Sequence, residues 1–400
     1  MVGVASILVD SFGEVKSGGH PIHRPSRHRP KDLNAQFGRS PYFVHNPSTH
    51  QPLQHRIKNR ICLGLPMSMR DSFGRPLRDL RISITDRCNF RCTYCMPREN
   101  FGPNHEFLAK EEILSYEEMA NVVASLLPLG LKKVRITGGE PLLRKDIHVL
   151  IEFLRNLDPK LELALTTNGV LLEKYAEILF KKGLNRVTVS LDAVEEEMFQ
   201  QITDSRKSPN DVLEGINKAL NSGMQVKVNC VVKKGVNENQ IVPLAKLCIQ
   251  RNISLRFIEF MDVGTTNDWN MDSVMSGKEM RKVLQKHLGP LQPITPNHPS
   301  DVARLWRLVD GSKLGFIESV TNPFCGNCSR ARLSAHGSLY TCLFSESGYD
   351  LRGILRFGAT QSEIQEVIQG IWIHRDDRYS ELRNELKRNR KPVEMSFIGG

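Results

Sequence analysis

The chain reads Arg81-Ile-Ser-Ile-Thr-Asp-Arg-Cys-Asn-Phe-Arg-Cys-Thr-Tyr-Cys-Met-Pro97, and the three cysteines of this stretch are Cys88, Cys92 and Cys95. They follow an alternating apolar segment and have the spacing C-x3-C-x2-C. Three thiolates can ligate three irons of a 4Fe–4S cube and leave the fourth iron open, whereas cubes that only carry electrons usually have four cysteine ligands. Zinc sites usually pair two C-x2-C units. The spacing therefore favours an iron–sulfur cluster whose open iron binds a ligand directly.

A second group of cysteines lies near the C-terminus, at Cys325, Cys328 and Cys342. Two interpretations remain open for it: a zinc site completed by His336, or a second cube with an open iron. The first group makes the second cube the favoured interpretation. Arg330 and Arg332 follow directly, and the planar guanidinium fork suits a polyphosphate or a purine carbonyl.

From residue 79 onward, apolar strand candidates alternate with amphipathic helix candidates. The expected strands are 79–84, 132–137, 161–166, 186–191, 225–231 and 254–260. The expected helices lie near 115–127, 145–155, 172–182, 211–222 and 239–249, with a later one near 277–287. Six consecutive βα units imply parallel strands joined by right-handed crossovers. We expect an α/β fold, an incomplete (β/α)6 TIM-like barrel, with a doubly wound open sheet as the alternative. In both, ligands gather at the carboxyl ends of the strands.

Short polar motifs fall at those strand ends. Gly138-Gly-Glu-Pro follows the second expected strand, where two glycines allow a ligand to approach the backbone and Glu140 can accept a hydrogen bond from an ammonium group. Tyr94 stands between two cysteines, so it either approaches a cofactor or simply packs. Several cations share the strands or their ends, namely Arg81, Lys133, Arg135, Lys227 and Arg256. Their convergence would be costly unless an anion binds among them.

The net charge of +11 is unevenly distributed. Residues 1–66 contain nine Lys and Arg against three acidic residues, together with six His and no sustained hydrophobic period. This composition is typical of a mitochondrial transit peptide, and a disordered, non-targeting tail is the alternative. We expect this leader to direct the protein to the mitochondrial matrix. The expected domains are the leader 1–66, a barrel 67–320 and a second-cluster region 321–400 that ends in Gly399-Gly400.

Composition also narrows the class of partner. Much of the basic excess lies in the leader, so we expect a small polyanion rather than nucleic acid to bind the body. No apolar run reaches the about 18 residues that a membrane span needs, so no membrane is expected. Six of nine cysteines fall in two tight groups, which indicates metal ligation in a reducing compartment rather than a disulfide scaffold.

The chain resembles the GTP 3′,8-cyclase family, radical S-adenosylmethionine (SAM) enzymes that begin molybdenum cofactor biosynthesis. The resemblance runs from about residue 68 to the end. It rests on the first cysteine motif and on the segments Gly74-Arg-Pro-Leu-Arg-Asp-Leu-Arg-Ile-Ser, Val134-Arg-Ile-Thr-Gly-Gly-Glu-Pro-Leu-Leu-Arg, Arg256-Phe-Ile-Glu-Phe-Met, Phe324-Cys-Gly-Asn-Cys-Ser-Arg-Ala-Arg and the terminal Gly-Gly. The first motif is generic to radical SAM enzymes, whereas the second motif with the tail is specific to this family.

The resemblance implies an incomplete barrel closed by a C-terminal region that carries the second of two 4Fe–4S clusters. The cluster that binds SAM would be held by Cys88, Cys92 and Cys95, and the cluster that binds GTP by Cys325, Cys328 and Cys342. The family's SAM contacts correspond to Tyr94, Gly139, Ser190 and Met261. Its GTP contacts correspond to Arg81, Arg135, Thr166, Lys227, Arg330, Ala331 and Arg332. A catalytic role is implied for Arg330, Arg332, Gly399 and Gly400, the tail entering the barrel near GTP.

The implied activity is that of a lyase in which a 5′-deoxyadenosyl radical from SAM takes the ribose 3′ hydrogen of GTP and C3′ joins guanine C8. The implied partners are an electron donor, a cyclic pyranopterin monophosphate synthase that uses the product, and a second copy of the chain in a homodimer. Two other functions remain open. One is a radical SAM enzyme that modifies a peptide, and the other is a zinc-dependent nucleic-acid binder.

Overall fold

The computed structural model describes residues 69–296, 300–386 and 390–399. The chain divides into two units, and every described residue belongs to the larger, Gly64–Gly400. The expected leader, 1–66, and the last residue, Gly400, lie outside the described residues. The fold and the site described here therefore belong to the larger unit alone.

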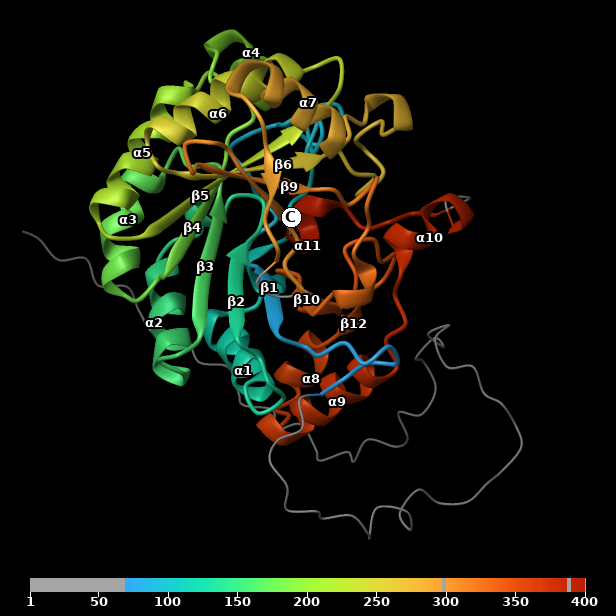
Figure 1. Cartoon of the computed structure of the whole chain (residues 1–400). Coiled ribbons are helices and arrows are strands. Elements are labelled where there is room, and N and C mark those ends of the chain that lie inside the picture. Colours follow the sequence, from blue (N-terminus) through green and yellow to red (C-terminus); the bar gives the residue numbers. More distant parts are fainter. Residues whose placement is uncertain (1–68, 297–299, 387–389, 400) are drawn as a thin grey trace, which may run out of the picture. The chain divides into compact units, whose positions relative to one another are not determined.

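One sheet of twelve strands is the frame of this unit, in the order β12-β11-β10-β1-β2-β3-β4-β5-β6-β9-β8-β7. Its centre consists of β1 (Asp79–Ser83), β2 (Lys133–Thr137), β3 (Glu162–Thr167), β4 (Arg186–Ser190), β5 (Gln225–Val232) and β6 (Ser254–Glu259). These six strands are parallel and confirm the six strands expected from the sequence. The described strands leave the sheet open, and its parallel part curves into an incomplete barrel (Figure 1).

Short strands that the sequence analysis did not predict extend both sides of the parallel centre. Beside β1 lie the parallel β10 (Arg330–Leu333) and the antiparallel β11 (Ser338–Tyr340) and β12 (Tyr349–Asp350). Beside β6 lie the parallel β9 (Lys313–Ile317) and the antiparallel β8 (Arg304–Arg307) and β7 (Gln292–Pro293). Five of these strands have two to four residues and are too short for apolar alternation to identify them, and β9, with five, has a glycine at its centre.

Helices cover the outer face of the sheet (Figure 1). Those that connect the strands are α1 (Tyr116–Leu126), α2 (Ile147–Leu157), α3 (Leu172–Lys181), α4 (Glu196–Thr203), α5 (Pro209–Asn221), α6 (Ile241–Gln250) and α7 (Gly277–Leu288). All but α4 were expected. The chain ends with α8 (Arg352–Arg356), α9 (Gln361–Ile373), α10 (Tyr379–Leu386) and α11 (Met395–Ile398). Single 3-10 turns are η2 (Lys110–Glu112), η3 (Pro141–Leu143), η4 (Glu238–Gln240), η5 (Met271–Ser273) and η6 (Cys325–Asn327). None of the described helices is long and apolar enough to cross a membrane.

Reciprocal hydrogen bonds define where several helices begin. Before α1, the Glu118 backbone N–H donates to Ser115 Oγ at 3.1 Å, and the Ser115 N–H donates to the Glu118 carboxylate at 2.6 Å. Ser276 and Glu279 form the same capping box before α7. Each box satisfies two backbone donors that have no partner within the helix, so these helix starts are encoded locally.

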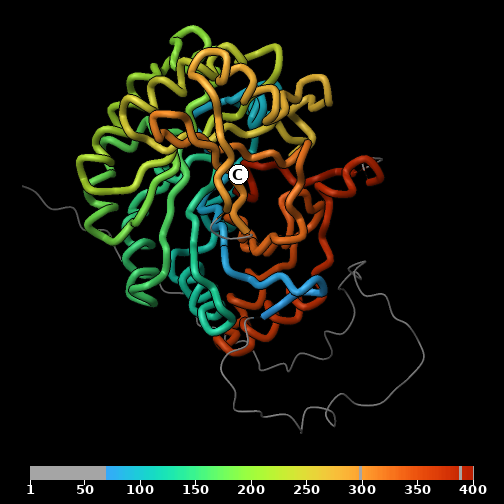
Figure 2. The backbone as a smooth tube through the Cα atoms, in the orientation of Figure 1, coloured from blue at the N-terminus to red at the C-terminus, as the bar shows by residue number. Residues whose placement is uncertain are grey.

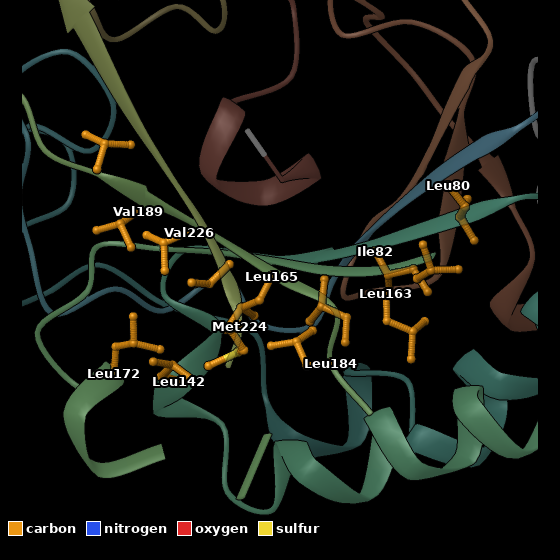
Figure 3. Packing of buried hydrophobic residues seen from close by; sticks show 14 of the residues in the cluster. Leu80, Ile82, Leu142, Leu163, Leu165, Leu172, Leu184, Val189, Met224 and Val226 are labelled. Atoms are coloured by element: carbon orange, nitrogen blue, oxygen red, sulfur yellow. The ribbon is translucent and has the colours of Figure 1, made fainter. Parts of the chain in front are cut away.

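The two faces of the parallel strands carry different side chains, because successive residues of a strand point to opposite faces. Leu80 and Ile82 on β1 and Leu163 and Leu165 on β3 are fully buried and pack in the apolar layer between sheet and helices (Figure 3). Arg81, between two of these residues, lines the interior of the barrel instead. The same alternation that builds the core thus supplies polar groups to the barrel interior.

Substitutions at two glycines test this packing, and we expect them to change the free energy of unfolding in opposite directions. At Gly215 in α5, an added Cβ would lie 2.5 Å from the Gly169 carbonyl oxygen, where α5 packs against α3. We expect Gly215→Ala to lower the free energy of unfolding by about 1–3 kcal/mol through overpacking. Gly370 in α9 is exposed with open space at its Cβ position, so Gly370→Ala should raise it by up to about 1 kcal/mol. Chemical denaturation measures both, and equal effects would contradict the packing argument.

Candidate active site

A cavity of about 320 Å3 occupies the interior of the incomplete barrel. Its wall contains all six grouped cysteines, Cys88, Cys92, Cys95, Cys325, Cys328 and Cys342. It also contains Tyr94, Gly139, Ser190, Met261, Arg81, Arg135, Thr166, Arg330 and Arg332, which are most of the ligand contacts expected from the sequence. The C-terminal segment lies on the open side of the barrel, inside the curve of the strands (Figure 2).

The two cysteine groups lie at opposite ends of this cavity. The first group follows the carboxyl end of β1. The second precedes β10, which is parallel to β1 and places Arg330 beside Asp79, the first residue of β1. Cys342 follows β11, which is antiparallel to β10 and so returns to the same end. The expectation that ligands gather at the carboxyl ends of the strands is therefore wrong for the second group, because this open barrel has a cavity that runs along its strands. At about 3.3 Å per residue, the five residues of β1 correspond to roughly 15 Å between the ends.

The first cysteine group sits in a loop that is held by its own backbone. The Cys95 N–H donates to the Cys92 carbonyl oxygen at 3.0 Å, and Arg91 donates to the Cys88 carbonyl oxygen at 2.8 Å. Burial raises the pKa of both Cys88 and Cys95 to about 12, and burial also raises the pKa of Cys92. Partly buried neutral thiols with no disulfide fit metal ligation, because a bound metal deprotonates the thiol.

In the second cysteine group, one thiol has a lowered rather than a raised pKa. Burial alone would raise the pKa of Cys328, but the Arg330 and Arg375 guanidinium groups lower it to about 6. Arg330 Nη2 lies 3.4 Å from the Cys328 sulfur. Burial raises the pKa of Cys342 to about 12. The two guanidinium groups thus favour the thiolate form of Cys328, which is the form that ligates a metal.

The zinc interpretation of the second group lacks support in the geometry. Throughout the described residues, no three His, Cys, Asp or Glu side chains converge as ligands of a single ion. His336 lies in the turn between β10 and β11 and is not part of the cavity wall. Three thiolates that ligate three different irons of a cube do not have to converge in this way. The donor set therefore fits two 4Fe–4S clusters.

Gly138, Gly139 and Glu140 hold the first cysteine loop. A Cβ on Gly139 would lie 2.4 Å from the Arg87 carbonyl oxygen, so only glycine allows this contact. Glu140 is buried and accepts hydrogen bonds from the Leu142 N–H, the Thr167 hydroxyl and the Asn168 N–H at 2.7–2.9 Å. Oε1 accepts two of these hydrogen bonds and Oε2 accepts one, so Oε2 keeps an acceptor position and the expectation that Glu140 receives a ligand's ammonium group stays a prediction.

Tyr94 is oriented by a buried carboxylate that the sequence analysis did not single out. Its hydroxyl donates to Asp192 Oδ2 at 2.5 Å, while the Val231 N–H donates to Asp192 Oδ1 at 2.8 Å. Burial raises the pKa of Asp192 to about 6. The pair joins the cysteine loop to the ends of β4 and β5 and fixes the ring beside the cavity.

Cations line the middle of the cavity. Arg332, Arg81 and Arg135 are direct neighbours in the register of β10, β1 and β2. Burial, the larger cause, and repulsion from nearby arginines lower the pKa of both Arg81 and Arg135 to about 9. The repelling groups are Arg135 and Arg330 for Arg81, and Arg186 and Arg256 for Arg135. On β6, Nε and Nη2 of Arg256 are buried without a hydrogen-bond partner among the described residues, as is Oδ1 of Asn229 on β5. Unpaired buried donors in a cationic wall fit a polyanionic ligand.

Two expected GTP contacts are placed differently. The Ala331 side chain is fully buried in the hydrophobic core beside Leu80, so only its backbone can reach a ligand. Lys227 lies on β5 between Thr188 and Ser254 and is not part of the cavity wall. Burial and Arg256 lower the pKa of Lys227 to about 8, which shows that it belongs to the same cationic interior.

The C-terminal segment reaches the cationic row. Arg332 Nη1 donates to the Gly399 carbonyl oxygen at 2.5 Å. A Cβ on Gly399 would lie 2.3 Å from Thr137 Cγ2, and the residue has a φ of +77°, so glycine is required twice over. Further back, the Glu394 carboxylate accepts hydrogen bonds from Thr265 and Thr266 at 2.7–3.0 Å. The segment is therefore docked rather than frayed as far as Gly399.

Comparison with known proteins agrees with this geometry. The family model for the radical SAM superfamily matches residues 82–248, and the model for Molybdenum Cofactor Synthesis C matches residues 253–381. A protein named GTP 3′,8-cyclase from Staphylococcus epidermidis (strain ATCC 35984) is 44% identical over 337 residues, which are 83% of this chain and 99% of that protein. One of the same name from Staphylococcus aureus (strain MRSA252) has the same identity and coverage.

Solved structures support the fold. Streptococcus suis SuiB bound to S-adenosylmethionine has a TM-score of 0.52 and 17% identity over 77% of this chain and 68% of its own. SuiB alone gives a TM-score of 0.53 at 16% identity, over 78% of this chain and 69% of its own. At this identity the likeness concerns the fold alone. The family follows instead from the curated relatives and the two family models: the chain belongs to the GTP 3′,8-cyclase family of radical SAM enzymes.

Proposed function

We propose that this chain is a SAM-dependent lyase that converts GTP to (8S)-3′,8-cyclo-7,8-dihydroguanosine 5′-triphosphate, the first step of molybdenum cofactor biosynthesis. One observation carries the proposal. Two groups of three cysteines, each able to leave an iron open, line opposite ends of one cavity whose middle is cationic. The curated relatives, which the chain covers over 99% of their length, are named for this activity.

The first cluster, when bound, supplies the electron that cleaves SAM to methionine and the 5′-deoxyadenosyl radical that takes the 3′ hydrogen of GTP. The chain's own part is to hold both molecules in line, which lowers the entropic barrier to reaction. We assign SAM to the carboxyl ends of the strands, where the wall contains Tyr94, Gly139, Ser190 and Met261.

We assign GTP to the middle of the cavity and to the end with the second cysteine group. Its contacts would be Arg81, Arg135, Thr166, Lys227, Arg330, Arg332 and the backbone of Ala331. A bound triphosphate offsets the repulsion within the row formed by Arg332, Arg81 and Arg135. Arg256, one of the cations noted in the sequence, and Asn229 have buried atoms without a hydrogen-bond partner among the described residues, which supports adding both to this assignment.

The two cysteine groups should be separable by mutation. We expect about eight irons per anaerobically purified chain and about four after the triple change Cys88→Ala, Cys92→Ala and Cys95→Ala, with SAM cleavage abolished. The matched triple change of the second group should also leave about four irons but retain SAM cleavage. Iron analysis and 5′-deoxyadenosine assays measure both, and SAM cleavage that persists without the first group would refute the assignment. Cleavage that depends on a peptide rather than on GTP would favour a peptide-modifying enzyme.

The tail should couple SAM cleavage to cyclisation. Deleting Gly399 and Gly400 removes the carbonyl that Arg332 binds but no part of the apolar core, so both clusters and the fold should persist. We expect 5′-deoxyadenosine to form with little product. With GTP deuterated at the 3′ carbon, deuterium transfer into 5′-deoxyadenosine should fall strongly. Normal transfer and normal product yield would show that the tail has no part in the reaction.

The product is a triphosphate with a new carbon–carbon bond, and we propose that a cyclic pyranopterin monophosphate synthase uses it next. An electron donor must reduce the clusters, and a homodimer is the proposed assembly. These partners are supported by the family and by the chemistry of the reaction.

We propose that residues 1–66 direct the protein to the mitochondrial matrix, since they are basic, rich in His and poor in acidic residues. A variant that starts near Pro66 should turn over normally in vitro, because the described fold begins at Met69. A reporter fused to the leader should enter mitochondria. A cytosolic reporter would overturn the targeting proposal without affecting the enzymatic one.

A further inference from the structure

Three buried charged residues, Asp71, Arg75 and Arg375, form an ion triad behind the second cysteine group. Arg75 Nε lies 2.5 Å and Arg375 Nη1 3.1 Å from Asp71 Oδ2. All three side chains are at most 2% exposed. The other Asp71 oxygen accepts the N–H groups of Phe73 and Arg75 at 3.0 and 2.8 Å. The carboxylate is thus fully occupied and holds the two guanidinium groups in fixed positions.

Other hydrogen bonds of the two arginines reach the backbone of Cys325, of Cys328 and of the residue before Cys342. Arg75 Nη1 donates to the Cys325 carbonyl oxygen at 3.0 Å, and Arg375 Nη1 donates to that of Cys328 at 2.8 Å. Arg375 Nε donates to the carbonyl oxygen of Thr341, the residue before Cys342, at 3.1 Å. The triad therefore ties together two segments that are separated by β10 and β11.

The first cysteine group needs no such support, because its three cysteines share one loop with hydrogen bonds inside it. In the second group, Cys342 lies fourteen residues after Cys328 on a different strand connection. The residues of the triad that hold this second group include Asp71 and Arg375, which are about three hundred positions apart in the sequence. The Arg375 guanidinium also stacks on Trp372, whose indole N–H donates to the Arg75 carbonyl oxygen.

We propose that Asp71, Arg75 and Arg375 are positioning residues that hold Cys325, Cys328 and Cys342 at the spacing the second cluster requires. The proposal rests on the proposed function in one respect, that the second group binds a cluster. The fork of an arginine satisfies the carboxylate and a cysteine carbonyl at once. Lysine keeps the charge but has a single nitrogen, so it cannot span the positions of Nε and Nη1. In Arg375 these two atoms reach the Thr341 carbonyl oxygen and, from Nη1, both Asp71 and the Cys328 carbonyl oxygen.

The test compares Arg375→Lys with Arg281→Lys in the full chain, purified anaerobically. Arg281 is the matched control: it forms a buried ion pair with Glu318 at 2.9 Å and stacks on Trp306 at 4.5 Å, the same distance as Arg375 to Trp372. It donates to no residue of either cysteine group. We expect the iron content of the Arg375→Lys variant to fall from about eight irons per chain to about four, or the electron spin resonance signal of its second cluster to change. SAM cleavage to 5′-deoxyadenosine should continue. Arg281→Lys should keep both signals.

Two further measurements keep the outcomes distinct. Thermal unfolding of the metal-free variants measures how much each change destabilises the fold alone. If both variants lose similar stability, a difference in cluster signal between them comes from the cluster site. If Arg375→Lys does not fold, Arg75→Lys gives the same readout through Cys325. Eight irons and an unaltered second signal in the folded variants would overturn the positioning role. Only about four irons in the unchanged protein would instead overturn the proposed function.

Discussion

The parallel pairing of β1 with β10 is the interaction on which the rest of the site depends. It places residue 330 beside residue 79, and so brings a segment from the end of the chain to the amino end of the first strand. Because the first cysteine group follows the other end of β1, the same strand pair determines which metal site lies at which end of the cavity. It also aligns Arg332 with Arg81, which starts the cationic row. The register of this strand pair thus fixes the positions of both metal sites and of the cationic side chains between them.

That cationic row carries an electrostatic cost. Several guanidinium groups are buried close together, and both burial and mutual repulsion lower their pKa values. Arg332 is fully buried and donates to a backbone carbonyl oxygen of the tail. A polyanion that neutralises these groups binds only the folded protein, so its binding energy also stabilises the fold. Ligand affinity and protein stability are therefore linked through the same side chains.

The sequence could predict those parts of the structure that are encoded locally. The strands from β1 to β6 were visible because their apolar segments recur at each step of a strand–helix repeat, and the cysteine groups because ligand spacing is short. Five of the strands β7 to β12 have only two to four residues, and β9 lies outside that repeat. The fixed position of Glu140 could not be predicted from its own motif, because its partners Thr167 and Asn168 come from the next strand of the sheet. The triad was not predicted, since Arg375 lies about three hundred positions from Asp71 and each member is an ordinary charged residue.

The depth of the cavity has a consequence for how two ligands meet. Its ends are separated by roughly the length of one five-residue strand, so a ligand held at one cysteine group leaves the other group free for a second ligand. Two ligands held in this way face each other along the middle of the cavity. That middle carries the row of Arg332, Arg81 and Arg135, so the ligands meet in the strand-lined interior and away from both cysteine groups.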